Sequence, residues 1–399
     1  MTKHDLINEV RHCLTHNILP YWSDTMVDPC GGFYGRRDGF DRLDGDAPKG
    51  AILNARILWT FSAAYRVIGN PEYLEMATRA KREIIDRFYD HKYGGIYWSI
   101  DADGKPLDTK KQFYALGFAI YGLSEYARAT GDAEALDYAI SLFRDIEAHS
   151  RDRVRGGYIE ALSRDWQPLG DMRLSEKDAN VAKTMNTHLH IIEPYTNLLR
   201  VWRDEALLEA TTALQRLFID RFVASGQRAH LGLFFDEDWT RTDGIISYGH
   251  DIEASWLMLE TAQVLGDKDL LAETMDVTAR IADAALEGRC FDGSMIYERH
   301  ASGSYDNDKH WWVQAENVVG EIYLYMFHNR TDMFDKAVES WQYIKANIID
   351  IEGGEWYWSR KNGAVNRTDD KAGFWKCPYH NSRMCLEIIE KLRLAMCRF

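Results

Sequence analysis

A short motif of glycine and aromatic residues recurs six times along the 399-residue chain, and it constrains the fold more than any other feature. The copies begin at Gly31, Gly94, Gly156, Leu231, Gly293 and Gly353, at steps of 63, 62, 75, 62 and 60 residues. Glycine readily adopts positive φ and aromatic residues favour strands, so each copy predicts a turn that leads into a short β-strand. Internal repetition at such a period is typical of solenoids and closed rings.

A second repeat, out of phase with the first, predicts where helices begin. It consists of an Asn or Asp before a helical segment, at Asn70, Asp132, Asp204, Asp267 and Asp332. Such a side chain accepts hydrogen bonds from the free amides of a first helical turn, and Pro71 suits the first helical position. An apolar helical stretch precedes each of these caps, over 51–68, 112–129, 185–202, 250–265 and 311–328. Each unit of the repeat is therefore helix, tight turn, helix and a longer loop.

Five such helix pairs, an opening helix over 5–21 and a closing helix over 378–394 make twelve predicted helices. An open stack of repeats would need polar caps at both ends, whereas the two unpaired end helices can complete a sixth pair. We therefore predict an all-α fold, an (α/α)6 barrel, as a single domain over residues 1–399. The helices that follow the long loops are expected to form its inner ring.

Charge and composition exclude several classes of function. Lys and Arg number 48 against 62 Asp and Glu, and a net charge of −14 would repel nucleic acid. No apolar run is long enough to span a membrane, and acidic residues stand near the start where a signal peptide would be apolar, which predicts a soluble cytoplasmic protein. The six cysteines contain no Cys-x-x-Cys pair and predict reduced thiols. The 13 tryptophans suit either core packing or stacking on sugar rings.

Polar residues gather near the start of the predicted inner helices, in otherwise apolar surroundings. They are Arg56, Asn186, His188, His190, His250, Asp251, Glu253, Trp311, Trp312, Glu316 and His380. All lie within about two turns of the same end of their helices, so a closed ring would bring them to one central pocket.

Each of these residues also has a purely structural interpretation. An arginine in an apolar run, such as Arg56, is commonly half of a buried ion pair. His188 and His190 are about 200° apart on a helix, so only one faces inward, and the apolar residues after them favour His190. Pro194 removes an amide and predicts a kink near His190.

Two carboxylates are candidates for orienting an imidazole. Glu253 lies three residues after His250 on the same helix face, where it could fix the imidazole tautomer or form an ordinary surface pair. Asp178 precedes an inner helix and is either a charged loop residue or a second such partner.

Imidazoles are the side chains best matched to proton transfer at neutral pH. Two of them on opposite faces of a sugar carbon could remove a proton from one face and return one to the other, which is epimerisation. Arg56 would stabilise the enediolate oxygen, and Trp312 and Trp375 would stack on the sugar ring. No phosphate-binding glycine motif is present, so no nucleotide cofactor is predicted.

Several sequence blocks resemble the N-acylglucosamine 2-epimerase superfamily, and most closely its cellobiose 2-epimerase group. The blocks are Gly31–Gly35, Ala55–Trp59, Lys183–Asn186 with Leu189–His190, Ser247–Glu253, Trp311–Glu316 and Trp375–His380. The resemblance spans nearly the whole chain. It implies an (α/α)6 barrel that epimerises the reducing-end glucose of cellobiose or lactose at C2 through ring opening, without a cofactor or a metal.

The same resemblance implies roles for individual residues. His250 and His380 are similar to the general acid/base pair, and His190 to the group that assists ring opening. Arg56 and Asn186 then bind sugar oxygens around C1 and C2. The remaining implied substrate-site residues are Tyr114, Trp312 and Trp375 as walls and stacking platform, with Glu253, Asp178 and Glu316 supporting them. The implied partner is a disaccharide, and the chain is expected to be a monomer or a weak homodimer.

Four alternatives remain open at this point. A D-mannose 2-epimerase, or another aldose or N-acylglucosamine epimerase-isomerase, would carry a similar pattern. An (α/α)6 glycoside hydrolase would use two carboxylates among Glu253, Glu316 and Asp178 but would leave three histidines unexplained. A metal-dependent isomerase would use the histidines and a carboxylate as ligands, and would be sensitive to chelators. A non-catalytic sugar-binding ring would need the aromatic residues but not the histidines.

Overall fold

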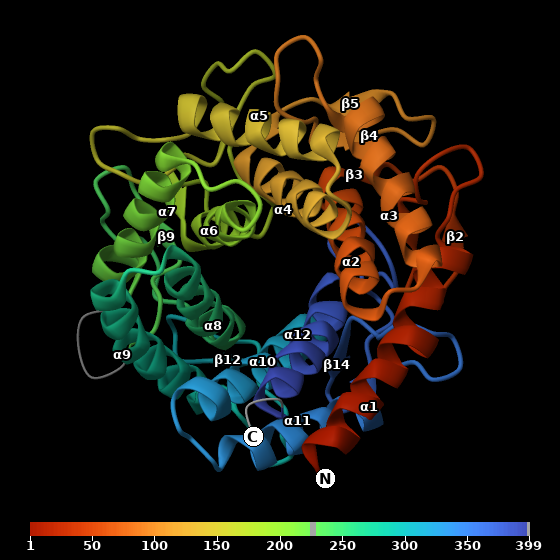
Figure 1. Cartoon of the computed structure of the whole chain (residues 1–399), viewed down its shortest axis with the longest axis vertical. Helices are drawn as coiled ribbons and strands as arrows, with labels where there is room; N and C mark the ends of the chain where they lie inside the picture. The colour runs from red at the N-terminus through yellow and green to blue at the C-terminus, as the bar shows by residue number, and fades with distance from the viewer. Residues whose placement is uncertain (224–228, 397–399) are drawn as a thin grey trace.

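The protein, described by a computed structural model over residues 1–223 and 229–396, is built of two concentric rings of helices (Figure 1). The inner ring consists of α2 (Ala51–Ile68), α4 (Phe113–Thr130), α6 (Met185–Leu199), α8 (Tyr248–Leu265), α10 (Trp311–Phe327) and α12 (Tyr379–Met396). The outer ring consists of α1 (Lys3–Cys13), α3 (Pro71–Glu83), α5 (Ala133–His149), α7 (Glu205–Leu217), α9 (Lys268–Ala285) and α11 (Met333–Asn347). The predicted (α/α)6 barrel is confirmed, with the helices that follow the long loops inside.

The ring is closed by its first and last helices. Each inner helix packs on the next, and α12 completes the circle by packing on α10 and α2 (Figure 1). Helix α1 packs on α12 from outside, so the two end helices form the sixth pair. Five cysteines in the described residues are free thiols; Cys397 lies outside those residues.

The two rings differ in how much of each helix is buried. Every residue of α2 from Ala51 to Ala64 is buried, whereas α3 buries only the face that carries Ala77 and Ala80. A helix that is apolar all round needs cover on all sides, which only the inner ring offers. No helix in the described part of the chain combines the length and apolarity that a membrane crossing requires.

Short π-helical or 3₁₀ turns extend several outer helices before the chain turns inward. They are η1 (Leu14–Ile18), η2 (Tyr21–Thr25), η3 (Ile84–Phe88), η4 (Phe218–Phe222) and η5 (Leu286–Gly288). The glycine motif follows, and in each copy a residue after the turn forms an antiparallel bridge with the end of the preceding outer helix. These bridges are Val27–Phe33, Tyr89–Ile96, Arg151–Tyr158, Val223–Leu231, Arg289–Met295 and Ile349–Trp356. The repeat therefore predicts the turn correctly, but the residues after it form a single bridge and not the expected short strand.

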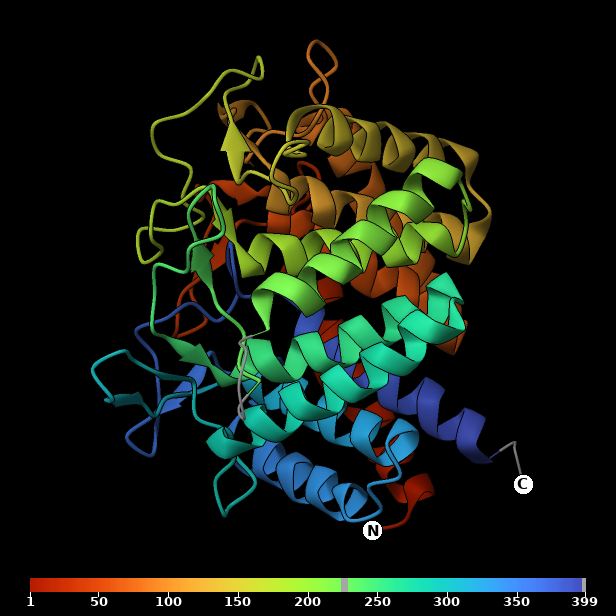
Figure 2. The ribbon, with the colours of Figure 1, turned by 90° about the vertical axis from the view of Figure 1, so that its left-hand side faces the viewer.

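The true strands lie beside the inner-helix starts, at the long-loop end of the barrel (Figure 2). They are β1 (Arg36–Arg37), β2 (Leu43–Asp44), β3 (Lys49–Gly50), β4 (Ser99–Ile100), β5 (Pro106–Asp108), β6 (Lys111–Gln112), β7 (Ala161–Leu162), β8 (Lys183–Thr184), β9 (Phe234–Phe235), β10 (Ile246–Ser247), β11 (Glu298–Arg299), β12 (Tyr305–Asp306), β13 (Lys309–His310), β14 (Ser359–Lys361) and β15 (Ala364–Val365). The strand before one inner helix pairs with a strand of the next unit, as β3 does with β4 and β13 with β14. These pairings hold the starts of neighbouring inner helices in register.

Four of the five predicted helix caps are confirmed. The side chains of Asn70, Asp132, Asp204 and Asp267 each accept a hydrogen bond from a backbone amide of the first turn. Asp332 was predicted to do the same and does not. Its backbone is already helical (φ −65°, ψ −22°), and its carboxylate lies 3.3 Å from Lys336 instead.

This difference predicts unequal costs for two matched substitutions. We expect Asp267→Ala to destabilise the protein by about 1 kcal/mol, because two first-turn amides lose their acceptor. Asp332→Ala removes only two exposed ion pairs, to Lys336 and Arg330, and should cost well under that, about 0.5 kcal/mol or less. Urea denaturation followed by circular dichroism measures both changes. An equal loss in the two variants would contradict the assignment of the cap.

Candidate active site

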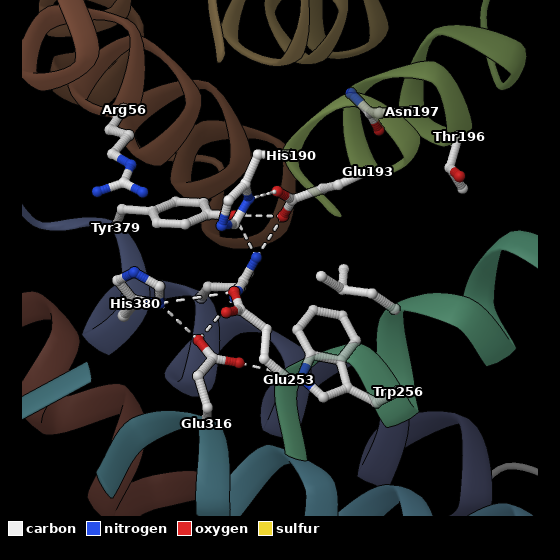
Figure 3. Close-up of polar contacts among 12 residues, drawn as sticks. Arg56, His190, Glu193, Thr196, Asn197, Glu253, Trp256, Glu316, Tyr379 and His380 are labelled. Carbon is white, nitrogen blue, oxygen red and sulfur yellow. Dashed lines mark hydrogen bonds and ion pairs between the residues drawn. The ribbon is translucent and has the colours of Figure 1, made fainter. Parts of the chain in front are cut away.

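Several predicted site residues lie together near the starts of the inner helices, among them Arg56, His190, Glu253, Glu316 and His380 (Figure 3). Figure 3 shows His190, Glu193, Glu253, Glu316 and His380 converging from α6, α8, α10 and α12 on one cluster. His190, Glu253, Glu316 and His380 come from the first two turns of their helices, so the strand pairings described above also set their mutual positions, and Glu193 follows one turn after His190.

Arg56 is buried at 3 % exposure and has no carboxylate partner among the described residues. One terminal nitrogen donates to the Tyr114 hydroxyl at 2.9 Å, and the other contacts the Cys377 sulfur at 3.8 Å. The guanidinium carbon lies 4.1 Å and 4.8 Å from the ring centres of Phe118 and Tyr379. The buried ion-pair interpretation of Arg56 is therefore wrong. A cation without a carboxylate partner is suited to stabilise negative charge that develops on a substrate oxygen.

His190 faces the cluster and His188 does not, as predicted. Helix α6 is kinked at His190 (φ −91°, ψ 15°), because Pro194 has no amide to donate the helical hydrogen bond to the His190 carbonyl. The His190 Nδ1 atom lies 2.9 Å from Glu193 Oε2. His188 points outward, accepts from the Tyr158 amide and contacts the Thr184 carbonyl, and burial lowers its pKa to about 3. His188 thus anchors the loop at Tyr158, and both of its ring nitrogens are already hydrogen-bonded.

His250 and His380 both contact the indole of Trp312, at ring-centre distances of 4.9 Å and 5.6 Å. Since one side chain touches both imidazoles, they are close enough to serve one substrate. The Nδ1 atom of His250 is 2.8 Å from Ser247 Oγ, so the expected support from Glu253 is wrong. Burial lowers the pKa of His250 to about 3, which favours the neutral imidazole that can accept a proton.

The Nδ1 atom of His380 lies 2.7 Å from Glu316 Oε1 and 3.9 Å from Glu253 Oε1. Burial lowers the pKa of this imidazole, and the charges of Arg56 and Arg383 lower it further. The carboxylate that the sequence assigned to His250 therefore lies nearer His380.

An arginine that the sequence reasoning missed joins these carboxylates. Arg383, fully buried, donates to Glu193, Glu253 and Glu316. Burial raises the pKa of Glu253, to about 7, and that of Glu316, while the Arg383 charge opposes both shifts. Helical spacing could have revealed two members of this network: Arg383 is three residues after His380, and Glu193 is three residues after His190.

Of the remaining predicted residues, Tyr114, Trp375 and Asn186 have contacts that suit a substrate site, and Asp178 does not. Tyr114 and Trp375 stand edge to face at 6.0 Å, and Tyr114 also contacts the His190 ring at 5.0 Å. The Asn186 side-chain oxygen has no hydrogen-bond partner among the described residues. Asp178 does not orient an imidazole: its carboxylate accepts from the amide and hydroxyl of Ser175, within its own loop.

Glu253, Glu316 and His380 offer three ligand atoms within 4.8 Å of one another, the spacing that a metal ion would need. Arg383, however, donates to both of these carboxylates. A cation at this position would have to displace a buried guanidinium that already bonds to both carboxylates. The donor set therefore fits a metal poorly.

Comparison with known proteins places the chain in a family. The profile of the N-acylglucosamine 2-epimerase family matches residues 32–382. The chain belongs to this family. Among its relatives, the cellobiose 2-epimerase of Bacteroides fragilis is 57 % identical over 96 % of this chain and 98 % of the relative. That of Ruminococcus albus is 41 % identical over 97 % of this chain and 99 % of the relative. The solved cellobiose 2-epimerase of Bacillus thermoamylovorans superimposes with a TM-score of 0.93 at 40 % identity, covering 97 % of this chain and 99 % of that one.

Proposed function

We propose that this member of the N-acylglucosamine 2-epimerase family is a cellobiose 2-epimerase, which interconverts glucose and mannose at the reducing end of a disaccharide. The observation that carries the proposal is the pair of imidazoles, His250 and His380, on one indole beside a cationic Arg56. Relatives of that name match nearly the full length of the chain.

The reaction follows from the chemistry of these groups. His190 assists opening of the sugar ring, which exposes the C1 aldehyde and makes the C2 proton acidic. One of the pair His250 and His380 removes that proton, and Arg56 stabilises the enediolate oxygen. The other imidazole returns a proton to the opposite face of C2, which inverts its configuration. Asn186, with its unpartnered side-chain oxygen, contributes a hydrogen-bond acceptor for a sugar hydroxyl.

The geometry argues against the hydrolase alternative. Inverting and retaining glycosidases place two carboxyl groups on either side of the scissile bond, about 5 Å or more apart. Oxygens of Glu253 and Glu316 lie within 4.8 Å of each other, and the same Arg383 nitrogen bonds to both.

A substrate panel tests the proposal. The enzyme is incubated with cellobiose, lactose, glucose, mannose and N-acetylglucosamine, and the products are resolved by NMR. We expect glucosyl-mannose from cellobiose and epilactose from lactose, with a higher kcat/KM on cellobiose than on mannose. Comparable or faster turnover of mannose would make this a monosaccharide epimerase. Release of free glucose from cellobiose would support the hydrolase.

Metal removal provides an independent check. Because Arg383 already bonds to the carboxylates that a metal would need, we expect exhaustive treatment with EDTA to leave kcat on cellobiose unchanged. The control is the same treatment followed by addition of Mn²⁺ or Zn²⁺. Activity that disappears with EDTA and returns with either ion would favour the metal-dependent isomerase instead.

A further inference from the structure

Two of the site histidines are held in the same way, although they come from different helices. His190 Nδ1 lies 2.9 Å from a Glu193 oxygen, and His380 Nδ1 lies 2.7 Å from a Glu316 oxygen. Each carboxylate accepts one further neutral donor. For Glu193 this is the Tyr379 hydroxyl, and for Glu316 it is the Trp256 indole N–H at 3.0 Å.

The third donor to both carboxylates is the same side chain. Arg383 Nη1 donates to Glu193, and Arg383 Nη2 donates to Glu316 at 2.6 Å and also to Glu253. The guanidinium carbon is sandwiched 4.3 Å and 4.7 Å from the ring centres of Tyr379 and Trp256. Ring packing and hydrogen bonds together leave the guanidinium one orientation, so the two carboxylates are positioned relative to each other.

We propose that Arg383 is a positioning residue shared by His190 and His380, and that it sets the tautomer of both imidazoles at once. The inference deepens the proposed epimerase function and rests on it. Apart from the two imidazoles, the groups that bond to Glu193 and Glu316 are all donors, which is the pattern that an ionised carboxylate accepts. Nδ1 of each histidine must then carry the proton, which leaves Nε2 as the basic nitrogen that faces the substrate.

A lysine cannot replace this guanidinium. The planar fork of Arg383 serves Glu193 with one nitrogen and Glu253 and Glu316 with the other, whereas an ammonium group is a compact point charge. Arg383→Lys therefore keeps the buried positive charge and removes the fixed geometry. It tests positioning without leaving three carboxylates unneutralised.

The control is Arg289→Lys. Arg289 is a partly buried arginine between carboxylates, at 2.7 Å from Glu321 and 2.8 Å from Glu339, and none of its partners belongs to the site. We expect both variants to lose stability. Only Arg383→Lys should lose kcat on cellobiose, by about 10²-fold as for a misplaced catalytic group, with KM nearly unchanged because Arg383 is fully buried behind the histidines it positions.

The decisive measurement does not depend on activity. In protein labelled with ¹⁵N-histidine, with signals assigned from His190→Gln and His380→Gln variants, the wild type should show the Nδ1–H tautomer at both positions. Arg383→Lys should change both signals together, and Arg289→Lys neither.

A change at one histidine alone, or at neither, would overturn the shared role. Equal loss of kcat in both lysine variants would also overturn it, because general destabilisation of the protein would then explain the loss. If the wild type does not epimerise cellobiose, the proposed function is wrong. The tautomer measurement still tests the role of Arg383, because it does not depend on activity.

Discussion

Replacing His250 or His380 with Asn is expected to lower kcat for cellobiose epimerisation by about 10²- to 10⁴-fold, the usual contribution of a general acid or base. Asparagine keeps a polar group of similar reach but has no titratable nitrogen. The two variants need not behave alike, because each loses the proton transfer on one face of C2 and keeps it on the other. Each variant can still exchange the C2 hydrogen of one epimer without converting it to the other.

Turnover in D₂O separates this mechanism from its rivals. Histidine protons exchange with water, so product made by the wild type should carry deuterium at C2, measured by NMR. A route that returns the same hydride would retain the original hydrogen. The matched control is His149→Asn, on outer helix α5, where the imidazole stacks on Trp166, and its kcat should be normal. Full retention of protium, or near-normal turnover in both site variants, would contradict the two-base assignment.

Arg56→Met is expected to show a large loss of activity without a loss of stability. Because the guanidinium meets the developing enediolate charge, kcat/KM should fall by about 10²- to 10³-fold, as when one oxyanion donor is removed. The folded protein, however, gains no ion pair from Arg56 and bears the cost of burying its charge. An apolar side chain of similar length relieves that cost, so the urea midpoint should be equal or higher.

Arg56→Lys serves as the companion variant. It keeps the charge but loses the stacking between Phe118 and Tyr379, and should recover only part of the activity. A marked fall in the urea midpoint of Arg56→Met would show that Arg56 is mainly structural, and normal kcat/KM in that variant would remove it from the mechanism.

The features that were predictable from sequence are those with local causes. The glycine turns, the Asx caps and the apolar inner helices each act within one repeat, so counting repeats was enough to predict a closed barrel. The kink at His190 was predictable for the same reason, since Pro194 lies four residues away. Asp332 was mispredicted because a cap depends on backbone angles that the residue type does not determine.

The polar network was not predictable in the same way. Arg383 binds Glu193 across 190 residues and Glu253 across 130 residues of sequence, and no repeat relates these positions. For the same reason Glu253 was assigned to its helical neighbour His250, whereas closure of the ring brings it nearer His380. Asp178 sits in a long loop whose path the sequence pattern does not describe.

The closing helix also has a consequence for how the protein is made. Ribosomes synthesise Glu193, Glu253 and Glu316 before α12, which brings Tyr379, His380 and Arg383. A nascent chain that lacks α12 therefore holds three inward carboxylates with no guanidinium between them, and like charges in a buried space repel. The five inner helices made before α12 should therefore remain loosely assembled during translation and pack tightly only when α12 docks. Catalytic competence and the completed fold then arise together.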